Sequence, residues 1–218
     1  MRGMTEEQIQ HICKLVHNGG KLYVGREASG RQKLKIVRGR GFTADLCNAW
    51  EQEALHAGPL GVRVAMLRFG LILGRDGGAW PLMTMTMPFG LGALFGDGRQ
   101  WMAWIHKQDA LRLIETAIDD ARLTGPINAV APRETTHGDV MRAAAETVGC
   151  KLLIPAPAFA LRLALGEMSA LFLDSQRVIP RAAGAAGFTF KFATIEDAAA
   201  DLLGRAPPTP APNLIHLG

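Results

Sequence analysis

Apolar residues recur at helical spacing in several stretches of the chain and predict helices there. The predicted helices cover residues 5–17, 42–57, a run that opens at Asp109, and the stretches that begin after Thr136 and Thr194. In the run from Asp109, the apolar face comprises Ala110, Ile114, Ala117, Ile118 and Ala121. Thr136 and Thr194 each precede an aspartate by three residues, and Gly149 and Gly204 follow, so both helices have capping signals at their two ends.

Shorter apolar runs between these helices predict strands. Residues 62–67 are nearly all apolar, residues 127–130 form a second short strand, and Phe188, Phe190 and Phe192 alternate with polar positions as in a half-buried strand. Residues 74–95, rich in Met, Gly and Pro, predict an irregular segment, either the wall of a pocket or a buried connection packed with methionines. Residues 155–173 predict two short helices on the surface.

One helix, a tight turn at Gly58-Pro59 and a fully apolar strand follow one another directly. This order predicts one helix-to-strand step of a parallel sheet, in which strands are covered on both faces. The fold class is therefore α/β.

The stretch from Gly96 to Asp109 reads as turn, short strand and helix. Asp97-Gly98 is a strong turn signal, because glycine takes positive φ without a steric penalty. Two tryptophans and an isoleucine follow, and Asp109 suits the positive end of the next helix.

Gly-Asp-Gly-x-Gln, followed by an aromatic-aliphatic-His and an Asp that opens a helix, resembles the substrate-side segment of extended short-chain dehydrogenase/reductases. The similarity is strongest to the atypical, nucleoside-diphosphate-sugar epimerase-like branch that ends in a C-terminal domain of unknown function. It covers about residues 41–204. It implies the C-terminal half of a Rossmann-like fold, with a partial parallel sheet and a small substrate-side α/β lobe.

The resemblance divides the chain into four parts. Residues 1–40 form a basic segment, read as a helix and a hairpin, that is unlike the family. Residues 41–149 are the partial Rossmann and substrate-side region, residues 150–204 are the C-terminal family domain, and residues 205–218 are a proline-rich tail.

The resemblance implies NAD(P) as the cofactor, yet the expected cofactor-binding features are missing. Enzymes of this fold bind the pyrophosphate on a glycine-rich turn between a strand and a helix. The nearest pattern here, Gly90-x-Gly92, is read as turn or packing glycines. At the family's Tyr and Lys positions the chain has Phe42 and Leu46, which cannot titrate, a departure that the atypical branch shares.

Seven residues are candidates for contacts with cofactor or substrate. Arg68 and Gly70, at the end of a strand, resemble the family's residues beside the nicotinamide. The substrate-side candidates are Arg99, Gln100, Trp101, Trp104 and His106. Each has a plainer alternative: an exposed turn arginine for Arg99, core filling for the tryptophans and a strand–helix junction for His106. Met102 stands where classical epimerases have a diphosphate-binding arginine, which lowers support for a UDP-sugar substrate.

Composition adds limits on location and partners. With 218 residues and 48% hydrophobic content, the chain can bury a core of its own. The net charge of +4 arises in residues 1–40, where nine basic residues face three acidic ones. A basic hairpin can bind nucleic acid, but a solvated charged face is the favoured interpretation. Three scattered cysteines without metal-type spacing, no secretory signal and no membrane span predict a cytoplasmic protein without a metal site.

Together these features predict an NAD(P)-dependent epimerase or oxidoreductase of unknown substrate that is inactive alone. The alternative is a non-catalytic binding module with a basic N-terminal arm. The strand at residues 62–67 lacks the cover that a complete sheet would give it. We therefore expect self-association, or a partner that supplies the N-terminal half of the fold.

Overall fold

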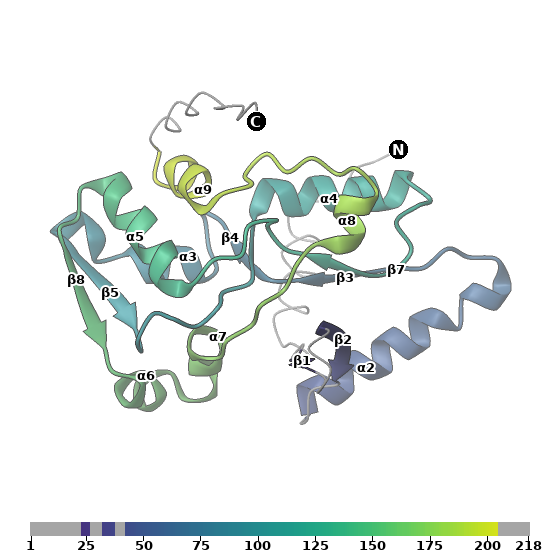
Figure 1. The fold of residues 1–218 in the computed structure, drawn as a ribbon, viewed down its shortest axis with the longest axis horizontal. Coiled ribbons are helices and arrows are strands. Elements are labelled where there is room, and N and C mark those ends of the chain that lie inside the picture. The colour runs from purple at the N-terminus through teal and green to yellow at the C-terminus, as the bar shows by residue number, and fades with distance from the viewer. Residues whose placement is uncertain (1–22, 27–31, 38–41, 205–218) are drawn as a thin grey trace.

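Helices and strands alternate along the part of the chain that the computed structural model describes, residues 23–26, 32–37 and 42–204 (Figure 1). The helices are α2 (Phe42–Leu55), α3 (Ala79–Thr84), α4 (Lys107–Asp119), α5 (His137–Val148), α6 (Ala158–Leu165), α7 (Ala170–Leu173), α8 (Arg181–Ala185) and α9 (Ile195–Leu202). The strands are β1 (Tyr23–Arg26), β2 (Gln32–Val37), β3 (Ala65–Phe69), β4 (Leu71–Leu73), β5 (Leu91–Phe95), β6 (Trp104–His106), β7 (Gly125–Ala129) and β8 (Leu152–Ala156). Short 3-10 turns occupy Gly58–Leu60, Met87–Phe89 and Gly166–Ser169. The helix predicted at residues 5–17 and the tail at 205–218 lie outside the described residues.

The strands pair in parallel, which confirms the α/β class. β3 pairs with β7, β4 with β6, and β5 with β8. β1 and β2 pair in the antiparallel sense, as the predicted basic hairpin requires. β3 begins at Ala65, three residues later than predicted, because Val62 is exposed and the guanidinium of Arg63 is used elsewhere.

Gly70 is the point at which the chain passes from one strand pair to the next. Its N–H donates to the carbonyl oxygen of Ala129, the last residue of β7. The N–H of the next residue, Leu71, donates to the carbonyl oxygen of Ala103, just before β6. A Cβ at Gly70 would lie 2.6 Å from the Ala103 oxygen, so only glycine permits this approach.

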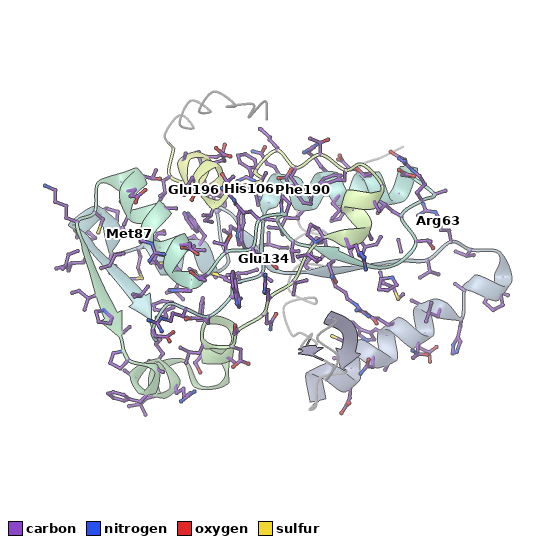
Figure 2. The ribbon with its side chains drawn as sticks, viewed as in Figure 1. Arg63, Met87, His106, Glu134, Phe190 and Glu196 are labelled. Atoms are coloured by element: carbon purple, nitrogen blue, oxygen red, sulfur yellow. The ribbon has the colours of Figure 1, made fainter. Side chains whose placement is uncertain are left out.

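Helix α4 packs on the β3–β7 pair and supplies a core of its own. Ala110, Leu113 and Ala117 are buried against Ile127 and Ala129 of β7. The predicted face of this helix was partly wrong: Ile118 is 59% exposed, because the helix ends at Asp119 and the buried face runs through Leu113 instead. Arg63 closes the helix by donating to the carbonyl oxygens of Ala117, Ile118 and Leu123 (Figure 2).

A second core joins α3, α5 and α9 to the β5–β8 pair, at the other end of the molecule in Figure 1. The segment predicted as irregular contains helix α3 and strand β5, and Met83 and Met87 are each 1% exposed. The interpretation of a buried connection packed with methionines is therefore confirmed for Met83 and Met87 but not for Met85, which is 61% exposed, and the segment is not irregular throughout. Strand β8 was not predicted. Its apolar residues Leu152 and Ile154 are exposed and it contains Pro155, so it lacks the alternation that marks a half-buried strand.

Both predicted capped helices are present. Thr136 caps α5 in a complete capping box with Asp139, and Gly149 ends that helix with a positive φ of 73°. The hydroxyl of Thr194 accepts from the N–H of Asp197 at the start of α9. The phenylalanine strand was wrong, because the N–H groups of Lys191 and Phe192 donate to the carboxylate of Asp109 instead of to a neighbouring strand.

The region 155–173 holds short helices at the surface, as predicted. Phe159 and Leu163 of α6 are 73% and 88% exposed. None of the described helices is long and apolar enough to cross a membrane.

Candidate functional site

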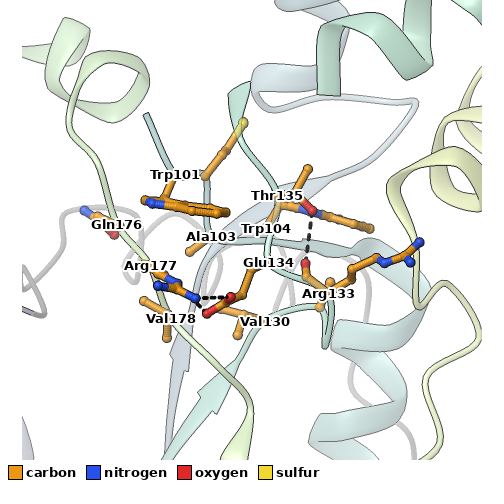
Figure 3. Close-up of a pocket in the computed structure, with 12 residues that line it drawn as sticks. Trp101, Ala103, Trp104, Val130, Arg133, Glu134, Thr135, Gln176, Arg177 and Val178 are labelled. Carbon is orange, nitrogen blue, oxygen red and sulfur yellow. Dashed lines mark hydrogen bonds and ion pairs between the residues drawn. The ribbon is translucent and has the colours of Figure 1, made fainter. Parts of the chain in front are cut away.

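A narrow pocket lies directly after strand β7, where ligands bind in parallel sheets. Three segments form it: the residues that lead into β6, the loop between β7 and α5, and the residues that follow α7 (Figure 3). Its volume is about 230 Å³, including the part open to solvent. The lining residues are Trp101, Met102, Ala103, Trp104, Val130, Ala131, Arg133, Glu134, Thr135, Gln176, Arg177 and Val178.

An ion pair between Glu134 and Arg177 lies in the pocket. Arg177 donates from Nε and Nη2 to the two carboxylate oxygens at 2.7 and 2.6 Å, a bidentate geometry. This bonding lowers the pKa of the Glu134 carboxyl and raises that of the Arg177 guanidinium. Both side chains remain partly exposed, at 30% and 50%. Glu134 is therefore ionised at neutral pH and cannot serve there as a proton donor.

Trp101 forms the wall beside this pair. The guanidinium carbon of Arg177 lies 5.0 Å from the centre of the indole ring, a cation–π contact. The backbone of Trp101 also holds the segment that carries Arg177, because its N–H donates to Ser175 Oγ and its carbonyl oxygen accepts from the N–H of Gln176. Arg133 extends away from the pair, as Figure 3 shows.

Trp104 is the buried tryptophan of the two. It is 1% exposed, and its Nε1–H has no hydrogen-bond partner among the described residues. The chain therefore places one of the predicted tryptophans at the open side of the pocket and the other in the core behind it.

The cofactor-side candidates lie outside the pocket lining. Arg68 makes two 2.7 Å hydrogen bonds to the carboxylate of Glu51 on helix α2. This bonding raises its pKa, and the pair joins α2 to strand β3. Gly70 serves the close backbone approach already described.

Gln100 and Arg99 have structural contacts instead of pocket positions. Gln100 Nε2 donates to the carbonyl oxygens of Phe95 and Phe172, each at 2.9 Å, so it joins β5 to α7. Arg99 is exposed, and its backbone N–H donates to Asp97 Oδ1 in the turn.

His106 forms the junction between β6 and α4. Its Nδ1 accepts from the N–H of Gln108 as a helix cap, and its ring lies 3.7 Å from that of Phe192. Nε2 is 3.3 Å from Asp201 Oδ2 in α9, an ion-pair distance when the ring is protonated. Figure 2 shows His106 between α4 and α9. Burial lowers its pKa, against the opposing effect of the two neighbouring aspartates.

Sequence reasoning missed the charged pair at the pocket. Glu134 and Arg177 are 43 residues apart and come from irregular segments, so no periodicity links them. The buried carboxylate of Asp109 was predicted only as a helix-start residue, whereas it accepts from two backbone N–H groups and from Arg112.

The described residues do not fit the pyrophosphate of a dinucleotide. Gly90 has a φ of 82° and ends a 3-10 turn, and a Cβ at Gly92 would lie 2.5 Å from the side chain of Leu153. These glycines permit a turn and close packing, as predicted, and not a phosphate cradle. No group of metal-binding side chains occurs within the described ranges.

Comparison with known proteins identifies relatives of the chain. Residues 156–202 match the family described as a domain of unknown function, DUF1731. The epimerase family protein YfhF of Bacillus subtilis is 36% identical over 162 residues, which are 74% of this chain and 53% of that protein. The chloroplastic SDR39U1 homologue of Arabidopsis thaliana is 35% identical over 81% of this chain and 50% of that protein. The chain thus spans about half the length of the curated relatives it matches.

Solved structures similar to this chain are also epimerase-type proteins. The human epimerase family protein SDR39U1, solved with NADPH, superposes with a TM-score of 0.71 at 28% identity and covers 77% of this chain and 57% of that one. The UDP-glucose 4-epimerase of Thermus thermophilus, at 18% identity and a TM-score of 0.61, shows the shared fold alone.

Proposed function

We propose, from its similarity to epimerase family proteins, that this chain is the substrate-side part of an NAD(P)-dependent epimerase or oxidoreductase of the extended short-chain dehydrogenase/reductase type. One observation carries the proposal. The pocket at the carboxyl end of β7 combines an aromatic wall, Trp101, with a charged pair, Glu134 and Arg177, in the place where parallel sheets bind ligands.

The cofactor would need a second structural element. Gly90 and Gly92 do not form a pyrophosphate cradle, whereas the family resemblance implies Arg68 and Gly70 as contacts beside the nicotinamide. We propose that the phosphates bind to the half of the fold that the relatives have and the described residues do not supply. The two described cysteines are free thiols, which supports a cytoplasmic location.

A non-catalytic binding module is the second candidate. It is favoured by Phe42 and Leu46, because neither side chain can transfer a proton at the positions where the family has its Tyr and Lys. In that case the pocket would bind a ligand without converting it.

Titration of NADPH and NADH tests the first proposal. The purified chain alone should bind either cofactor more weakly than about 10 μM. The chain co-expressed with the first half of the Bacillus relative should bind NADPH more tightly, and Arg68→Gln should weaken that binding.

The matched control is Arg122→Gln, which removes another arginine–carboxylate pair, with Asp120, at the far end of α4. The cofactor assignment would be contradicted if the complex did not bind NADPH. It would also be contradicted if Arg68→Gln and Arg122→Gln weakened NADPH binding equally.

A further inference from the structure

The carboxylate of Glu134 occupies the position that an external carboxylate or phosphate would take on Arg177. Its two oxygens face Nε and Nη2 in the arrangement that a guanidinium forms with free anions. The guanidinium also contacts the indole ring of Trp101, at 5.0 Å from its centre, so Arg177 has a second contact besides Glu134.

The pair can exchange partners readily. Both side chains are partly exposed, and exposed ion pairs add little to stability. Arg177 also lies in an irregular segment beyond the end of α7, which Ser175 Oγ and the N–H of Gln176 join to the backbone of Trp101. Release of Glu134 therefore leaves the fold of both cores intact.

The pocket lining is mixed: Arg133, Thr135 and Gln176 contribute polar groups, while the side chains beside the pair include apolar ones. Ala103, Val130 and Val178 lie around the ion pair in Figure 3, and Trp101 adds its ring face. The space inside the pocket holds about one water molecule, so a ligand would place only its charged end at the pair and lie along the open side. Arg177 is the lining cation beside these apolar side chains, since Arg133 extends away from the pair, and this favours an anionic group on an apolar body.

We propose that Arg177 determines substrate specificity by releasing Glu134 and binding a carboxylate or phosphate group of the substrate, whose apolar part lies against Trp101. The proposal rests on the proposed function, since it uses the same pocket. Met102 cannot make the diphosphate contact of classical epimerases. In this proposal Arg177, in the segment after α7, supplies the anion contact instead.

The test follows binding of three probes to the full chain by NMR, at the indole N–H signal of Trp101. The probes are benzoate, inorganic phosphate and neutral benzamide. Benzoate or phosphate should bind, and benzamide should bind more weakly than benzoate. Binding of benzoate alone would assign a carboxylate, and binding of phosphate alone would assign a phosphate.

Substitutions separate this role from a structural one. Arg177→Gln should abolish anion binding, and Arg177→Lys should restore part of it. Glu134→Gln removes the competing carboxylate and should tighten anion binding by up to about fivefold. Arg122→Gln, the matched control, should leave the affinity unchanged.

Several results would overturn the proposal: no probe binding at millimolar concentration, equal binding of benzamide and benzoate, or weaker anion binding by Glu134→Gln. Circular dichroism of each variant checks that the fold is retained. Cofactor titration is a separate measurement, so failure of the anion site and failure of NADPH binding are distinguishable.

Discussion

His137 is a buried histidine whose ring nitrogens both lack hydrogen-bond partners among the described residues. It lies in the first turn of α5, fully buried, and its ring stacks on Phe95 at 4.8 Å between centroids. Burial lowers its pKa to about 4, because the charged imidazolium would lose its hydration. No pattern in the sequence predicts this burial.

This histidine should make the protein less stable in mild acid. Between about pH 6.5 and pH 4 the unfolded chain binds a proton at this residue and the folded chain does not, so the free energy of unfolding falls as the pH falls, by up to about 3 kcal/mol. His137→Phe should remove this part of the pH dependence. Urea unfolding of both proteins at pH 7.5 and pH 4.5 measures the difference.

The effect of His137 is the difference between the pH dependences of the original protein and His137→Phe. Other groups also titrate in this range, among them His106, whose pKa is lowered too. A pH dependence that is identical in both proteins would show that His137 is accessible to protons in the folded state.

Gly70 should tolerate no side chain. Gly70→Ala would place a Cβ 2.6 Å from the Ala103 carbonyl oxygen, a backbone atom that cannot move without breaking the β4–β6 pairing. We expect a loss of at least about 2 kcal/mol in the free energy of unfolding. Gly77→Ala is the control, because nothing lies within 4 Å of its Cβ position. Chemical denaturation of the two variants should separate them clearly, and equal effects would refute the close approach at Gly70.

At the scale of elements, the capping threonines of α5 and α9 should each contribute measurably to stability. Thr136 and Thr194 both accept from the backbone N–H three residues on, at 3.2 Å. Thr136→Ala and Thr194→Ala should each lower the free energy of unfolding by about 1 kcal/mol. Thr116→Ala, which removes an exposed hydroxyl within α4, should change it by less than about 0.5 kcal/mol. If the cap variants match this control in thermal unfolding, the caps do not stabilise these helices.

Elements with local signals were predictable from the sequence. The spacing of Thr136 to Asp139 and of Thr194 to Asp197 located two helix starts, and the glycine turn at residues 96–98 located the start of the central stretch. Elements whose partners are distant were missed. β8 needs β5 as its neighbour, and the phenylalanine segment is fixed by Asp109, which is 82 residues earlier than Lys191.

The candidate site divides in the same way. The aromatic residues Trp101 and Trp104 were predictable, because the Gly-Asp-Gly-x-Gln pattern marks their segment. The ion pair was not, since Glu134 and Arg177 meet only through the fold. Gln100 and His106 were predicted as substrate contacts, but their side chains bond to backbone groups. Gln100 donates to the carbonyl oxygens of Phe95 and Phe172, and His106 accepts from the N–H of Gln108.

At the scale of the whole molecule, strand β3 has an edge that no described strand covers. It pairs with β7 on one side, while the described contact on its α2 side is the Arg68–Glu51 pair. Helix α2 also exposes Trp50 and Leu55, at 45% and 44%. Uncovered strand edges and apolar surface favour association.

We therefore predict that the purified chain self-associates or is recovered with a partner that supplies the first half of the fold. Sedimentation velocity at micromolar concentration should show a species heavier than the 23.4 kDa chain. A stable monomer would mean that residues outside the described ranges complete the sheet.

The contacts of the Gly96–Asp109 stretch also limit how gene recombination can alter this chain during evolution. The segment that matches the family of unknown function, residues 156–202, is fastened to that stretch by Gln100 at Phe172, His106 near Asp201 and Asp109 at Phe192. A gene rearrangement that moved the segment alone would leave the buried Asp109 carboxylate without its backbone donors. The stretch and the segment must therefore be inherited together.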